Sequence, residues 1–91
     1  MNKTIELQPH VDKIKQAVNI ICAQNNLKQP LTIPSAGRLI AEHNGIDYAI
    51  ELFENAYIEC KESSDTDTRV FSSAAYKATL DIVLLPKKVN P

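Results

Sequence analysis

The side chains best suited to bind a transition metal or to act as nucleophiles are few in this chain and widely separated. They are His10, Cys22, His43 and Cys60, and no pair has the Cys-x-x-Cys or His-x₃-His spacing of a metal site. Both cysteines fall on apolar helical stripes, where a thiol usually serves as a small buried side chain. His43 lies near the expected end of a short helix, where an imidazole complements the helix dipole. We therefore expect no metal centre.

Carboxylates are the other groups with chemical potential. Glu51 and Glu54 are one helical turn apart, a spacing that lets two carboxylates share a proton or hold a cation. A catalytic carboxylate needs burial or a specific neighbour to shift its pKa, whereas both of these are predicted on an exposed face. The segment ESSDTDT (62–68) has oxygen ligands but lacks the glycine and the closing glutamate of a calcium loop. With no catalytic triad order and no glycine-rich phosphate loop, the sequence predicts a protein that is not an enzyme and holds no cofactor.

The charge is distributed unevenly along the chain. The stretch 42–67 contains eight of the eleven acidic residues and one cation, Lys61, which gives it a net charge of −7. The flanking segments 1–41 and 68–91 each carry a net charge of +3, so that the whole chain has a net charge of −1. A cluster of this sign disfavours contact with nucleic acid through the middle of the chain.

Length and composition predict one small domain. The chain has 91 residues, of which 44% are hydrophobic, with no Trp and five Tyr and Phe in total, so its core must be mainly aliphatic. A core of this size is often completed by a second subunit, and we expect a homodimer. No signal peptide and no apolar run of membrane-spanning length is evident, and two cysteines do not make a disulfide framework. We expect a cytoplasmic protein without a membrane partner.

Apolar residues recur at intervals of three and four in two long segments, which predicts helices over 9–25 and 46–62. The first stripe is Val11, Ile14, Val18 and Ile21, and the second is Ile46, Ile50, Phe53, Tyr57 and Cys60. Ser35 and Gly45 suit the two ends of a short helix over 36–44. The remaining segments are predicted as an extended N-terminus (1–8), a polar loop (63–69) and a basic tail (86–91).

The C-terminal element fits two patterns. Phe71, Ala75, Ala78, Ile82 and Leu85 keep helical spacing, which predicts a helix over 72–85. Alternation of apolar and polar residues over the same stretch instead fits a half-buried strand. We favour the helix, which gives a mainly α domain. The alternative is an α+β domain with 70–85 and short N-terminal segments as strands.

The middle of the chain resembles a helix-turn-helix motif, with 38–43 as the first helix, Gly45 in the turn and the helix from Ile46 as the recognition helix. The residues that would then face the bases are Asp47, Glu51 and Glu54. Their carboxylates would meet the phosphate backbone, which opposes binding. A dimeric DNA-binding regulator therefore remains the alternative function, and it would have to use the cations Lys13, Lys15 or Arg38.

The helix over 46–62 separates into two faces. Asp47, Glu51, Glu54 and Glu62 fall within about 80° of one another on a helical wheel, with Ile58 among them and Glu59 beside them. A solvated face is the commoner meaning of such a charge run. The absence of lysines four residues away and the presence of Ile58 instead favour docking on a basic protein surface. By analogy, this fits a regulator or inhibitor, such as a phage or mobile-element inhibitor of a nucleic-acid-handling host machine.

Overall fold

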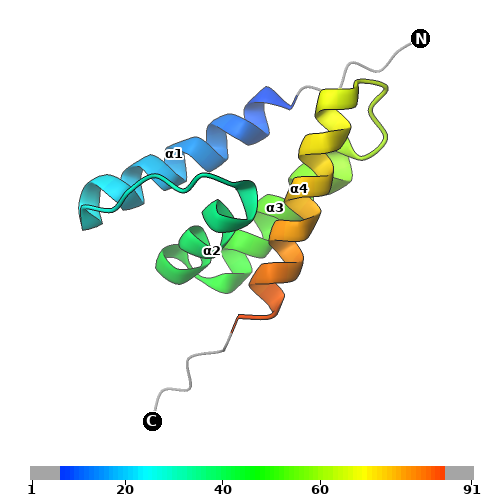
Figure 1. Cartoon of the computed structure of the whole chain (residues 1–91). Coiled ribbons are helices and arrows are strands. Elements are labelled where there is room, and N and C mark those ends of the chain that lie inside the picture. The colour runs from blue at the N-terminus through cyan, green and yellow to red at the C-terminus, as the bar shows by residue number, and fades with distance from the viewer. Residues whose placement is uncertain (1–6, 86–91) are drawn as a thin grey trace.

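The computed structural model describes residues 7–85, and within that range the chain forms four α-helices and no strand (Figure 1). The helices are α1 (Gln8–Asn25), α2 (Ile33–Asn44), α3 (Ile46–Cys60) and α4 (Thr66–Val83). The predicted all-helical class is confirmed. The α+β alternative is wrong, because the residues that could have formed its longest strand belong to α4.

Two caps set the starts of α2 and α4, and both helices begin earlier than the sequence predicted. The backbone N–H of Thr68 donates to the carboxylate of Asp65 at 2.9 Å, so that α4 begins at Thr66, inside the predicted loop 63–69. The hydroxyl of Thr32 accepts from the backbone N–H of Ser35 at 3.2 Å, and α2 begins at Ile33 with a proline in its first turn. Each cap satisfies a backbone donor that would otherwise lack a partner, which extends the helix upstream.

The two long helices lie close to their predicted positions. α1 begins at Gln8 and ends where Asn26 takes a left-handed conformation, with φ 53° and ψ 50°. α3 ends at Cys60, two residues before the predicted end. Residues 1–6 of the predicted extended N-terminus and the predicted basic tail 86–91 lie outside the described range.

The core is aliphatic and is built mainly by α2, α3 and α4, each of which contacts the other two. Its largest fully buried side chains are Phe53, Ile40 and Ile82, one from each of these helices. α1 lies across α2 and α3 and makes no contact with α4 (Figure 1). None of the four described helices is long and apolar enough to cross a lipid bilayer.

α2 and α4 approach closely at Gly37. A Cβ atom at this position would lie 3.1 Å from the Cβ of Ala78 and 3.3 Å from the Cδ1 of Ile82. Larger residues at Gly37 or Ala78 would therefore push α2 and α4 apart.

We expect Gly37→Val to lower the free energy of unfolding by about 1–3 kcal/mol, because its methyl groups must displace α4. Urea denaturation followed by circular dichroism measures this change. Ala23→Val, at an exposed position of α1, is the matched control and should cost less than about 1 kcal/mol. Equal losses in the two variants would contradict the close helix contact.

Candidate functional site

Several carboxylates of α3 lie on the side opposite to the one that enters the core. The residues of α3 that enter the core are Ala49, Phe53, Ala56 and Cys60. On the opposite side lie Asp47, Glu51 and Glu54, and Glu62 continues the same line in the turn after the helix. We call these four exposed carboxylates the acid row. Ile58 lies among them and keeps 51% of its surface exposed.

The acid row has no cationic partner in the described part of the chain. The two ion pairs found there are His10–Glu59 and Arg38–Asp81, and neither includes a member of the row. Lys61 is close in sequence, but its ammonium lies 5.6 Å from the centre of the Tyr57 ring. The negative charge of the row is therefore screened by water and salt, or neutralised by a partner.

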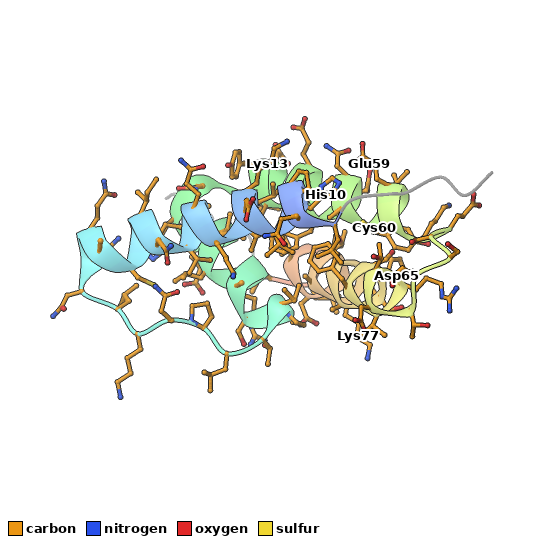
Figure 2. All side chains as sticks on the ribbon, turned by 90° about the horizontal axis from the view of Figure 1, so that it is seen from above. His10, Lys13, Glu59, Cys60, Asp65 and Lys77 are labelled. Atoms are coloured by element: carbon orange, nitrogen blue, oxygen red, sulfur yellow. The ribbon has the colours of Figure 1, made fainter. Side chains whose placement is uncertain are left out.

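Glu59 has a different role from the one predicted. It leaves the acid row and reaches α1, where its Oε2 lies 2.5 Å from Nε2 of His10 (Figure 2). His10 is buried, whereas the Glu59 side chain is 61% exposed. Since α1 makes few other polar contacts with the remaining helices, this pair fixes its N-terminal end on α3. The sequence does not reveal it, because the two residues are far apart in the chain.

We expect Glu59→Ala to lower the free energy of unfolding by about 1 kcal/mol, as loss of a partly exposed charge-assisted contact does. Amide hydrogen exchange should show the largest loss of protection in α1. Glu62→Ala removes an exposed carboxylate without an ion pair and should change stability by less than about 0.5 kcal/mol. Unchanged exchange in α1 would contradict the anchoring role of the pair.

Asp65 is also committed to the fold. Besides the backbone N–H of Thr68, it accepts the hydroxyl of Thr68 at 2.8 Å. These two hydrogen bonds, with help from the charge of Arg69, lower the pKa of the Asp65 carboxyl. A carboxyl whose pKa is lower in the folded state stabilises the fold above its unfolded pKa. That contribution is lost as the pH falls through the folded pKa.

We expect Asp65→Asn to weaken the acid dependence of stability, because asparagine also caps a helix but does not ionise. The difference in melting temperature between wild type and variant should be largest near neutral pH. It should shrink as the pH falls below the ordinary aspartate pKa of about 3.9. Thermal melts from pH 7 to pH 2 measure this. Asp67→Asn, in the same turn, is the control, and a parallel profile for wild type and Asp65→Asn would contradict the assignment.

The two cysteine thiols lie in the interior of the protein. Cys22 and Cys60 are buried free thiols, as predicted. Burial, and then the charge of Glu59, raises the pKa of the Cys60 thiol, which keeps it protonated and unreactive. Among residues 7–85, no three His, Cys, Asp or Glu side chains are grouped so that they could hold a metal ion.

Two hollows of about 180 and 260 Å³ lie along α1. The first is lined by Lys13, Gln16, Ala17, Ile20, Asn44 and Tyr48, and the second lies between α1 and residues 29–36. Neither lining contains a carboxylate or a histidine, so neither hollow presents a general acid–base pair.

The helix-turn-helix resemblance has little support in the geometry. α2 and α3 are joined by Gly45 alone, at φ 101°, whereas that motif has a turn of three or four residues. The first turns of α3 present carboxylates to solvent. The cations that DNA binding would need, Lys13 and Lys15 on α1 and Arg38 on α2, are exposed but lie on different helices.

One surface feature was not predicted from the sequence, and we call it the α4 stripe. Its members are Val70, Tyr76, Leu80, Val83 and Leu84, which are 45–80% exposed. At 100° per residue they fall within about 140° of one another, opposite the buried side of the helix. The sequence shows apolar residues at helical spacing on this side of α4, but it shows them on the opposite side as well. The pattern therefore does not predict which side is buried.

Comparison of the chain with protein-family models, curated proteins and solved structures finds no match.

Proposed function

We propose that this protein is a non-enzymatic binding protein that docks the acid row of α3 on a basic surface of a partner protein. The observation that carries this proposal is the set of four exposed carboxylates around the half-exposed Ile58, without an ion pair in the described part of the chain.

Repulsion between the carboxylates of the row lowers the stability of the isolated protein. Asp47 and Glu51 are four residues apart, and Glu51 and Glu54 three apart, so they repel along the helix. Each such pair costs about 0.2–0.5 kcal/mol. Glu59, Asp65 and Asp81 are each used in an intramolecular contact, whereas the row is not. A basic partner would offset this repulsion.

The chemistry of the row defines the partner. Long-range attraction between the carboxylates and lysines or arginines would speed association and would weaken with salt. Contact with Ile58 would slow dissociation. Channels that hold DNA or RNA are basic surfaces of this kind, so an inhibitor of a nucleic-acid-handling machine, of phage or mobile-element type, is the particular function we propose. The binding unit is a homodimer.

No observation favours the alternative of a dimeric DNA-binding regulator. Binding of random duplex DNA that falls steeply with salt would support that alternative. Failure to bind heparin at low salt would count against it.

We expect Glu51→Lys/Glu62→Lys to reduce partner binding tenfold or more, because two attractive contacts become repulsive. Tagged wild-type and variant proteins are compared by quantitative affinity purification from the native cell, and then by surface plasmon resonance on the recovered partner. Asp12→Lys/Glu42→Lys changes the net charge by the same amount at exposed sites outside the row, and should leave binding nearly unchanged. Equal recovery by wild type and the row variant would contradict the proposal.

Ile58→Ser distinguishes the contribution of the apolar contact from that of the carboxylates. It should raise the dissociation rate of the recovered partner while leaving the association rate and its salt dependence unchanged, because steering comes from the carboxylates.

A further inference from the structure

α4 buries mainly small side chains and exposes several large ones, although Phe71 packs partly buried against the core. Its buried residues are Thr68, Ser72, Ala75, Ala78 and Ile82, of which only Ile82 is a large apolar side chain. The five members of the α4 stripe face solvent instead. They are five of the ten large apolar residues that are exposed in the described part of the chain, and the exposed Arg69, Ser73 and Lys77 lie between them on the same side of the helix.

We propose that the α4 stripe is covered by the α4 stripe of a second copy of this chain, in a parallel, two-fold symmetric pair. A homodimer contact is self-complementary, so one apolar stripe supplies both halves of the interface. Pairing would remove roughly 1,000 Å² from water, near the lower limit for a specific interface. The dimer should therefore dissociate on dilution.

At the level of Lys77, the two sides of the stripe carry opposite charge. On the α3 side, the rings of Tyr57 and Tyr76 are 4.9 Å apart and the hydroxyl of Ser72 donates to the carbonyl oxygen of Tyr57 at 2.9 Å. Tyr57 is thus level with residues 72–76 of α4. Glu54 precedes Tyr57 by three residues on α3, and each residue of a helix advances it by about 1.5 Å. Because α4 runs antiparallel to α3, Glu54 is level with Lys77.

Lys77 lies on the other side of the line formed by Tyr76, Leu80 and Leu84, with Val70 beyond it. Asp81, one turn further along the same side of α4, pairs with Arg38 of α2 at 4.0 Å, so this side of the helix faces α2 rather than α3. Lys77 points outward from α4 (Figure 2) and forms no ion pair within residues 7–85. Glu54 likewise has no ion pair there.

The charges decide between the two possible directions of pairing. In an antiparallel pair, symmetry would place both α3 helices on the same side of the interface, with two acid rows near each other. In a parallel pair, the α3 side of each copy meets the α2 side of the other. Lys77 of each copy then lies opposite Tyr76 and, beyond it, Glu54 of its partner.

This pairing would supply the homodimer of the proposed function, and its contacts are separate from those that bind the partner. It involves Glu54, at the α4 edge of the acid row, and leaves Glu51, Ile58 and Glu62 outside the interface. Loss of one contact without the other therefore distinguishes the two proposals.

Analytical ultracentrifugation of the full chain tests the pair. The apparent mass should rise from 10.1 kDa towards twice that value as the concentration is raised into the high micromolar range. Leu80→Glu should raise the dissociation constant at least tenfold. Ile20→Glu is the matched control, because Ile20 on α1 is 50% exposed and Leu80 is 46% exposed. A monomer at every concentration, or equal effects of both variants, would overturn the interface.

Exchanging the charges of Glu54 and Lys77 tests whether the two α4 helices pair in parallel. This test remains valid even if the Leu80→Glu variant does not fold. Glu54→Lys and Lys77→Glu should each weaken the dimer about tenfold, since the symmetry makes each change occur twice. The double variant should return to within about twofold of wild type. Glu62→Lys should have little effect, and circular dichroism verifies the fold of each variant. Failure of the double variant to recover would overturn the parallel arrangement.

Discussion

The close contact between α2 and α4 at Gly37 and Ala78 is the constraint on which the arrangement of this protein depends. Without a Cβ at Gly37, the backbones of the two helices approach until Ala78 and Ile82 fill the space beside it. Phe53 of α3 then closes the core from the third side. This geometry decides which side of α4 packs on α2, and therefore which side of α4 faces solvent.

Two surfaces follow from that constraint. Because α3 places Phe53 and its alanines inward, its carboxylates point outward as the acid row. Because the close approach of α4 to α2 favours small residues on its inner side, Ile82 is the one large apolar residue of α4 that is fully buried, and the members of the α4 stripe lie outside. The acid row and the α4 stripe therefore arise from one packing solution, and the rings of Tyr57 and Tyr76 meet between them.

The carboxylates of the acidic segment are chemically alike in the sequence but have three roles in the structure. Glu59 holds α1 through His10, and Asp65 caps α4 through Thr68. Asp47, Glu51, Glu54 and Glu62 form no ion pair within the described chain and make up the row. Glu42 lies on α2 and Asp67 in the first turn of α4, both outside the row. Among residues 7–85, no three His, Cys, Asp or Glu side chains are grouped so that they could hold a metal ion, and burial raises the pKa of the Cys60 thiol.

The sequence by itself determined the helical class and the approximate positions of α1 and α3. Their apolar residues repeat at three and four over many turns, and local periodicity needs no tertiary information. It also determined which side of α3 is acidic. Only the tertiary structure decided the starts of α2 and α4, because a cap at Thr32 or Asp65 competes with equally plausible serines nearby. Only the tertiary structure removed Glu59 from the acid row and left the α4 stripe uncovered. The His10–Glu59 contact joins residues far apart in the chain, and the side of α4 that is buried depends on how closely Gly37 lets α2 approach.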